Sequence, residues 1–392
     1  MLNLPFNCTT NDVTFTICNS IEALDKDIWS NLNILDNIYL SIPYLRAMEK
    51  GMSEKMGFRY LTFFDRKKKA IGISVFQLVS YRSQELLQER VPFFISGKIK
   101  NHLLGDKELK LLICGNLYAC GENGYAYNGI DQDLFIKILC KSISVIKNFK
   151  NDGSKISFSL IKEFWMSSNK TFSVFKQEGF LDFNADVNMV LKVSSSWSKL
   201  EDYFTSMNTK YRTRAKAVFK KSNAIKTCTM EVVEIESHLS EIDILYKQVI
   251  KKSDYNLGIL NVAVFIELKR NLGEKFIFIG YFLNEILIGF ATSFLYRDIL
   301  DANFVGIDYK YNHEYKLYQR MLYDYVGLAI KHKKKELRLG RTAETIKSGV
   351  GGHPHEMKLF ARHRNFLPSK LLKPLISSIQ PNSFELRKPF KK

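Results

Sequence analysis

The hydrophobic pattern of residues 276–296 predicts a β-hairpin. The stretch FIFIGYFLNEILIGFATSFLY has 21 residues and one charge, Glu285, and a helix of this length could cross a bilayer. Asn284 and Glu285 lie near its middle, however, and the flanks are rich in Ile, Phe and Gly. This composition favours two buried strands joined by a tight turn over a membrane helix. We therefore expect no transmembrane segment.

The first half of the chain also contains a predicted hairpin, and in both halves a helical pattern precedes the hairpin. A helical pattern at 44–57 is followed by FRYLTFF, the charged turn DRKKK and AIGISVFQLVSY. In the second half, a helical pattern at 264–275 precedes the hairpin described above. Gly72 and Gly289 fall at the same place in the second strand of each hairpin. The pattern indicates an internal repeat.

Each hairpin is followed by Gly-Ile-Asp, at 129–131 and at 306–308, and then by an amphipathic helix and another strand candidate. Chance is the alternative, because short Gly-containing strands are common, but four features in the same order favour a repeat. The fold class is therefore predicted as α+β, with two units of largely antiparallel strands and a helix that crosses over to a further strand.

The repeat places a domain boundary near residue 190, where NMVLKVSSSWSKLEDYF changes from a strand to a Ser-capped helix start. The expected domains are residues 1–190 and 191–392. The first copy carries about 40 additional residues, judged from the spacing of the repeated glycines. They would form an insertion near 79–118.

Composition supports a folded protein with an anionic partner. The 392 residues are 46% hydrophobic, and 58 Lys and Arg against 40 Asp and Glu give a net charge of +18. Such a chain is not intrinsically disordered. The six cysteines are scattered without a CxxC pair, which argues against a zinc site or a disulfide scaffold. The first twenty residues do not resemble a signal peptide, so the protein is expected to be cytoplasmic and at most peripheral to the inner membrane.

The densest run of positive charge is SMNTKYRTRAKAVFKKSNAIK, residues 206–226, with seven Lys or Arg and no acid. Arg212 and Arg214 lie in its centre. A solvated helix face would explain the run without any function. The functional alternative is a surface for an anion, such as a nucleotide phosphate, a phosphopantetheine carrier, tRNA or a lipid headgroup.

A second polar cluster, LGRTAETIKSGVGGHPHEMKLFARHRN at 339–365, follows a predicted strand. Glu344 and His355 are candidate proton acceptors there, and Arg341 and Lys347 could hold an anionic group. Lys347 could instead pair with Glu344, and His355 could belong to an ordinary solvated turn. The glycines form neither a Walker loop nor a dinucleotide fingerprint, and the HxH spacing is a poor metal signal. No metal is expected.

These segments resemble the GNAT superfamily of acyl-CoA N-acyltransferases, and more narrowly the bacterial double-GNAT group that includes the Fem-type peptidoglycan aminoacyltransferases. The most specific part is NFVGIDYKYNHEYKLYQRMLYDYVGLAIKHKKKELRLGRTAETIKSGVGG. Its strand end is similar to the family pattern in Leu339-Gly340-Arg341, Thr342, Lys347 and Gly351. The resemblance covers most of the chain and implies two tandem GNAT-like domains.

The resemblance also implies a reaction, in which an amine attacks the acyl carbon of a thioester bound between two splayed strands. Helix N-terminal N–H groups would hold the donor's phosphates, and the helix expected to begin near His313 would provide them. Asn312, His313 and Lys316 are thus the expected donor-binding residues. The donor would be acyl-CoA or an acyl carrier protein thioester, with no permanently bound cofactor. The C-terminal half is expected to be the active one, because it keeps the compact strand–helix spacing and contains the polar cluster.

The chain departs from the family pattern at the pyrophosphate loop. The R/Q-x-x-G-x-G/A loop is absent, because Asp308–Glu314 contains no glycine. Two alternatives therefore accompany the acyltransferase: a Fem-like enzyme that uses aminoacyl-tRNA, and a non-catalytic module that binds an anionic partner. The acceptor is expected to be a small-molecule or lipid amine.

Overall fold

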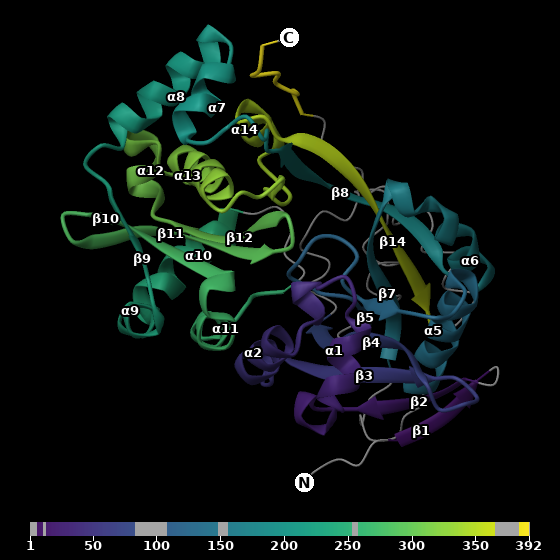
Figure 1. Cartoon of the computed structure of the whole chain (residues 1–392). Coiled ribbons are helices and arrows are strands. Elements are labelled where there is room, and N and C mark those ends of the chain that lie inside the picture. The colour runs from purple at the N-terminus through teal and green to yellow at the C-terminus, as the bar shows by residue number, and fades with distance from the viewer. Residues whose placement is uncertain are drawn as a thin grey trace, which may run out of the picture. The chain divides into compact units, whose positions relative to one another are not determined.

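The structure is a computed structural model that describes residues 6–10, 13–82, 108–147, 156–252, 258–364 and 384–391 (Figure 1). The chain forms two compact units. The first contains Met1–Ala185 and Glu356–Pro381, and the second contains Asp186–His355 and Asn382–Lys392. The units are described separately below.

Two strands pass from one unit to the other, which a single boundary at residue 190 did not anticipate. β8 (Leu181–Lys192) begins in the first unit and ends in the second, where it pairs antiparallel with β13 (Glu336–Arg338). β14 (His353–His363) begins in the second unit and ends in the first, where it pairs antiparallel with β7 (Ile156–Trp165). The exchange depends on strand pairing between residues far apart in the sequence, so local patterns did not reveal it.

The first unit is a sheet in the order β1-β2-β3-β4-β5-β7, with β5 and β7 parallel. The helix α5 contributes Phe135, Ile136 and Leu139 to the hydrophobic core. The remaining elements are β1 (Phe6–Thr10), β2 (Val13–Cys18), α1 (Lys26–Leu32), α2 (Ile42–Met52), β3 (Met56–Phe64), β4 (Ala70–Arg82), β5 (Glu108–Cys114), β6 (Tyr125–Tyr127), α5 (Gln132–Lys147) and α6 (Phe172–Gln177).

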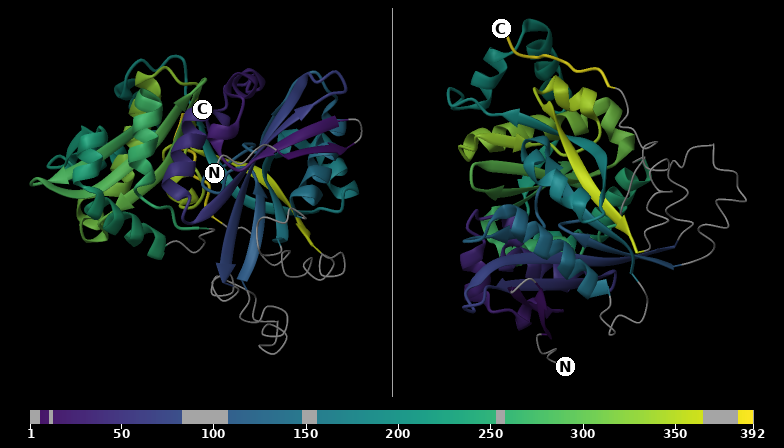
Figure 2. Two further views of the ribbon diagram at one scale, coloured as in Figure 1. Left: turned by 90° about the horizontal axis from the view of Figure 1, so that it is seen from below. Right: turned by 90° about the vertical axis from the view of Figure 1, so that its right-hand side faces the viewer.

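The second unit is a sheet in the order β9-β10-β11-β12-β13-β8 (Figures 1 and 2). The long helix α13 packs on one face, through Leu317, Met321 and Val326, among others. The elements are α7 (Leu200–Ser206), α8 (Thr209–Lys221), β9 (Lys226–Thr229), α9 (Val232–Ser237), α10 (Leu239–Lys252), α11 (Val264–Leu272), β10 (Phe276–Leu283), β11 (Ile286–Tyr296), β12 (Ile299–Ile307), α12 (Tyr309–Tyr315), α13 (Leu317–Lys331) and α14 (Glu344–Gly349).

The hairpin at 276–296 is confirmed. β10 and β11 pair antiparallel, and their buried positions explain the continuous hydrophobic run. Asn284 and Glu285 have φ values of 48° and 62°, and two successive positive φ values are typical of the tight turns that match strand twist. Within the described residues, no helix is both long and apolar enough to span a bilayer.

Gly72 and Gly289 occupy corresponding places in the two units. The carbonyl of Ile71 accepts a hydrogen bond from the N–H of Asn128, and the carbonyl of Ile288 accepts one from the N–H of Asp308, both at 2.9 Å. A Cβ on Gly72 would lie 2.3 Å from the Phe135 ring, and one on Gly289 2.7 Å from the Met321 side chain. Glycine at both positions lets the following helix pack closely on the sheet.

The additional residues of the first unit extend its strands. β4 continues to Arg82 and β5 covers Glu108–Cys114, so residues 79–82 and 108–114 of the predicted insertion at 79–118 are regular strand, and residues 115–118 begin a loop. Residues 83–107 of the insertion lie outside the described residues.

The C-terminal segment 384–391 packs against the turn after α14. Phe390 contacts Trp197 and Tyr203, with ring centroids 5.6 and 5.8 Å apart. The N–H of Asn208 donates to the carbonyl of Pro389 at 2.8 Å. Gly351 makes this packing possible, because a Cβ there would lie 2.4 Å from the Phe390 ring, and because its φ is +94°.

We expect Gly351→Ala to release the C-terminal segment, since the new methyl group would collide with Phe390 and alanine disfavours a positive φ. Hydrogen exchange of 384–391 should become fast while β10 and β11 stay protected. Gly349→Ala is the matched control, because its nearest atom lies 3.7 Å away, on the flexible Arg387 side chain, and its φ is not positive. Equal protection of 384–391 in Gly351→Ala and the wild type would contradict the prediction.

Candidate functional site

The parallel strands β12 and β13 part after three residue pairs. Ile299, Leu300 and Asp301 pair with Glu336, Leu337 and Arg338, in that order. Among the described strands, none pairs with the outer edge of Val305–Ile307, although these residues pair with β11 on the other side. The strands therefore diverge toward the end of β12 that leads into α12.

A β-bulge lies where the strands part. Ala291 is opposite Val305, while Ser293 is opposite Ala302, so the single residue Thr292 faces both Asn303 and Phe304. The buried Thr292 hydroxyl accepts a hydrogen bond from the N–H of Phe304 at 2.9 Å and donates one to its carbonyl at 3.2 Å. A bulge bends its strand and increases its twist, which explains why β12 turns away from β13 at this point.

Two helices follow β12, where the sequence predicted one helix beginning near His313. Asp308 caps α12 through a 3.0 Å hydrogen bond from the N–H of Lys310, and the exposed His313 lies inside this short helix. Lys316 then takes a left-handed conformation with φ 54°, and α13 begins at Leu317. The predicted helix start was therefore wrong by four residues, because a break at Lys316 is not visible in the hydrophobic pattern.

Asn312 and Lys316 lie at the N-terminus of α13. The Asn312 side-chain oxygen accepts the N–H of Tyr318 at 2.9 Å, and the carbonyl of Lys316 accepts the N–H of Arg320 at 2.9 Å. The N-terminus of a 15-residue helix carries partial positive charge, and the Lys316 ammonium adds to it.

The turn after β13 contains three residues in the left-handed region. Gly340, Thr342 and Ala343 have φ values of 72°, 61° and 53°. The N–H of Gly340 donates to Asn188 at 3.0 Å. The ammonium of Lys347, which is 4% exposed, donates to the carbonyl of Arg341. Lys347 thus stabilises the turn that carries Arg341, and the structure places this ammonium inside the turn rather than on its surface.

The two candidate proton acceptors have different neighbours. Glu344 begins α14 and lies near Tyr318, which belongs to the first turn of α13. Burial raises the pKa of Tyr318, and the nearby Tyr309 and the Glu344 carboxylate raise it further. His355 lies in β14, not in a turn. Partial burial lowers the pKa of His355, Glu336 opposes this, and the cations Lys192 and Arg338 reinforce it. Only Glu344 is therefore beside the α13 N-terminus.

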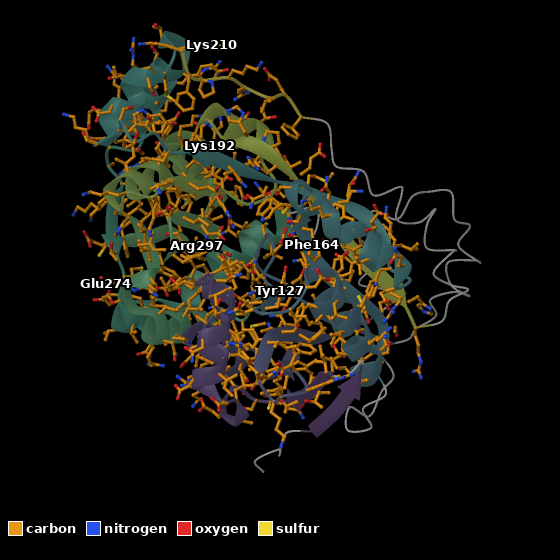
Figure 3. The ribbon with its side chains drawn as sticks, turned by 45° about the vertical axis from the view of Figure 1, so that its right-hand side comes forward. Tyr127, Phe164, Lys192, Lys210, Glu274 and Arg297 are labelled. Carbon is orange, nitrogen blue, oxygen red and sulfur yellow. The ribbon has the colours of Figure 1, made fainter. Side chains whose placement is uncertain are left out.

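The basic run of residues 206–226 forms α8. Its apolar side chains, Ala215 and Val218, are buried in the core of the second unit. Arg214 is exposed and lies over the Tyr211 ring at 5.6 Å, whereas Arg212 is half-buried. Lys210 projects from the start of α8 (Figure 3). None of the salt bridges between described residues involves a cation of α8.

Sequence reasoning missed two polar residues near the point where the strands part, Thr292 and Asp301. Asp301 is 3% exposed and lies opposite Arg338 in the last β12–β13 pair. A lone carboxylate in the apolar stretch ILDANFVGI was a visible signal, because buried charges are rare without a partner. Thr292 had no signal, since a threonine is common in strands.

The first unit has a different arrangement at the corresponding place. β5 and β7 remain paired from Lys110 to the last pair, Cys114 with Ile161. The segment Gly115–Gly124 then lies opposite Val75, which donates to the carbonyl of Gly124 at 2.9 Å and accepts from the N–H of Gly115 at 3.2 Å. A ten-residue loop thus stands where the second unit has a two-residue bulge.

Buried polar groups hold this loop in place. The ammonium of Lys162 in β7, 2% exposed, donates to the carbonyls of Asn116 and Leu117 at 3.0 Å each and lies 3.2 Å from the carboxylate of Glu163. The N–H of Leu117 also donates to Gln77 at 2.7 Å. The loop is therefore fixed next to the end of the β5–β7 pairing.

No protein-family model matches the chain, and no curated protein matches it in sequence. Solved structures share its fold. The structure of FemX is 10% identical, with a TM-score of 0.54 over 84% of this chain and 94% of that one. A tandem GNAT protein from the clavulanic acid biosynthesis pathway is 7% identical, with a TM-score of 0.53 over 90% and 99%.

The C-terminal domain of a protein assigned as a lysylphosphatidylglycerol synthetase, from Agrobacterium fabrum, is 7% identical, with a TM-score of 0.50 over 92% of this chain and 97% of that one. At such identities the similarity concerns the fold alone. Together with the repeated hairpin, crossover helix and parallel strand of each unit, these comparisons identify the chain as a protein of the double-GNAT, Fem-like fold.

Proposed function

We propose that the protein is an N-acyltransferase whose active site lies in the second unit, where β12 and β13 part. The acyl donor would lie along the outer edge of Val305–Ile307. The backbone N–H and carbonyl groups on this edge of β12 face no described strand, so they are available to form hydrogen bonds with an extended part of the donor. The observation that carries the proposal is the divergence of the two strands at a bulge that leads to the N-terminus of α13.

The first unit does not offer this arrangement. There β5 stays paired with β7 to its own last residue, Cys114, and the loop Gly115–Gly124 follows at the place of the bulge. The buried Lys162 would have to lose its hydrogen bonds before a donor could enter. These contacts favour the second unit as the active one.

Five of the predicted site residues have a place in the proposed mechanism. Lys316 and the first N–H groups of α13 would bind an anionic group of the donor, with Asn312 holding the helix start. Glu344 would accept the amine proton, directly or through water, because only the neutral amine is nucleophilic. The amine nitrogen then bonds to the acyl carbon, the carbon–sulfur bond breaks, and the thiolate leaves as the thiol with the proton that the nitrogen still has to lose. Lys347 would position Arg341 by stabilising its turn.

A second candidate function is supported by α8. Fem-like transfer of an aminoacyl group from tRNA would use an extended cationic surface, and α8 presents Lys210, Arg214, Lys216, Lys220 and Lys221 to solvent. Like charges four residues apart on a helix are destabilising, and no described acid neutralises them. A bound polyanionic donor or partner would offset the repulsion between these cations.

A thermal-shift screen separates the donor classes. Acetyl-CoA, long-chain acyl-CoA, loaded acyl carrier protein and aminoacyl-tRNA are each added to the full chain. A true donor at 100 times its dissociation constant should stabilise the protein by about 2.7 kcal/mol. Stabilisation by none of the four would contradict the acyltransferase proposal and favour a non-catalytic module.

Neutralising three exposed cations of α8 tests the basic surface. The triple variant Arg214→Gln, Lys216→Gln and Lys220→Gln should weaken aminoacyl-tRNA binding, and the slope of log K against log salt should fall by about 2 to 3. The control removes three exposed lysines elsewhere in the second unit, Lys275, Lys331 and Lys333. If both triple variants bind aminoacyl-tRNA with the same affinity and the same salt dependence, α8 is only a solvated helix face.

A further inference from the structure

Thr292, the single residue opposite the β12 bulge, forms three hydrogen bonds that join separate elements. The Thr292 side chain holds both the N–H and the carbonyl of Phe304, and the Thr292 backbone carbonyl accepts a 2.9 Å hydrogen bond from the Tyr325 hydroxyl of α13. Both side chains are buried, at 0% and 3% exposure. Thr292 therefore links the bend of β12 to the helix whose N-terminus is the proposed anion site.

The hydroxyl bonds to both backbone polar groups of one bulge residue, Phe304. In a regular ladder, the N–H and carbonyl of a strand residue bond to the backbone of the neighbouring strand. The residues opposite Thr292 are out of register, and its hydroxyl there supplies an acceptor and a donor to the Phe304 backbone. Because the hydroxyl makes both hydrogen bonds when Phe304 lies opposite it in the bulge, it favours the bulged form of β12 over alternative registers.

The first unit provides an internal comparison. Ile71 and Ile288 correspond through their matching hydrogen bonds to Asn128 and Asp308, so Val75, four residues after Ile71, corresponds to Thr292. Val75 has no hydroxyl. Opposite Val75 lies the loop Gly115–Gly124 rather than a short bulge. The hydroxyl is thus present in the unit whose strands part at a short bulge.

We propose that Thr292 is a positioning residue. Its hydroxyl fixes the bend of β12 so that the outer edge of Val305–Ile307 and the N-terminus of α13 bind the same donor. This proposal rests on the proposed function. Thr292 does not touch the donor itself. Its loss should lower affinity for the donor while the fold is retained, and a serine should restore it.

The test compares Thr292→Val, which keeps the shape without the hydroxyl, with Thr292→Ser, which keeps the hydroxyl. In the absence of ligand, backbone amides of 302–307 should exchange at least about tenfold faster in Thr292→Val than in the wild type, because the Phe304 N–H loses its acceptor. The β10–β11 turn should be unchanged. Val75→Thr in the first unit is the matched control and should leave residues 302–307 unaffected.

The binding arm uses acetyl-CoA as the probe, measured by calorimetry. We expect its dissociation constant to rise at least about tenfold in Thr292→Val and to return to within about threefold of the wild type in Thr292→Ser. Unchanged exchange at 302–307, or faster exchange with unchanged affinity, would overturn the proposal. If wild-type protein binds no acetyl-CoA, acetyl-CoA is not its donor, and the exchange of 302–307 in the valine and serine variants still decides whether Thr292 holds the bend.

Discussion

Replacing Glu344 by Gln is expected to lower turnover by about 10²- to 10⁴-fold, the usual cost of losing a general base. The amide keeps the size of the side chain but cannot accept the amine proton. The fold should be unaffected, because Glu344 is half-buried and forms no salt bridge among the described residues. Turnover is measured with the donor that the thermal-shift screen identifies, and the melting temperature is measured on the same samples.

His355→Gln is the matched control for Glu344→Gln. The charged neighbours of His355 lie on β8, β13 and β14, and none belongs to α13. We therefore expect this variant to keep nearly full turnover. The opposite result, a large loss in His355→Gln and none in Glu344→Gln, would make His355 the base. If both variants were fully active, the site would have to be sought at Asp308–Glu314 or in the first unit.

Replacing Lys162 by Met is expected to destabilise the first unit by about 3–5 kcal/mol, the cost of removing one partner of a buried ion pair. The carboxylate of Glu163 is fully buried and would lose the ammonium 3.2 Å away. The carbonyls of Asn116 and Leu117 would also lose their donor. The loop Gly115–Gly124 should then become exposed to exchange.

Urea unfolding followed by tryptophan fluorescence measures this effect. In a Trp197→Phe background the remaining tryptophans, Trp29 and Trp165, both lie in the first unit, so the signal reports on that unit. Lys176→Met is the control, because Lys176 is half exposed and pairs with Asp182 at 3.2 Å. Exposed pairs contribute about 0–1 kcal/mol. A Lys162→Met variant as stable as this control would show that the loop is held by other contacts.

Adding Glu163→Leu to Lys162→Met should recover part of the lost stability. A buried ion pair can often be replaced by apolar side chains without loss, but the two loop carbonyls would remain without the ammonium. Partial recovery would thus separate the cost of the lone carboxylate from the cost of the two lost hydrogen bonds. No recovery would mean that the loop carbonyls dominate the effect.

Local patterns in the sequence were sufficient for most elements and for the repeated hairpin. The two Gly-Ile-Asp segments, however, do not correspond: Gly72 pairs with Tyr127 and Gly289 with Ile307, so Gly129–Asp131 follows its strand whereas Gly306 and Ile307 lie in theirs. The hairpin at 276–296 was predictable because its strands are buried on both faces and Asn284 and Glu285 suit a tight turn. Gly72 and Gly289 marked corresponding strands, because each lies where a helix packs too closely for a Cβ. The basic run at 206–226 likewise forms a helix with exposed cations, as its pattern indicated.

The tertiary structure decided how these elements form a site. The break at Lys316 and the two-residue bulge opposite Thr292 depend on hydrogen bonds to residues that the hydrophobic pattern does not specify. The sequence gathered Glu344 and His355 into one cluster, but β14 leaves the turn as a strand and gives His355 other neighbours. A hydrophobic pattern records which face of an element is buried. Strand pairing between residues far apart in the sequence determines which side chains lie beside that element, and this information is absent from any single segment.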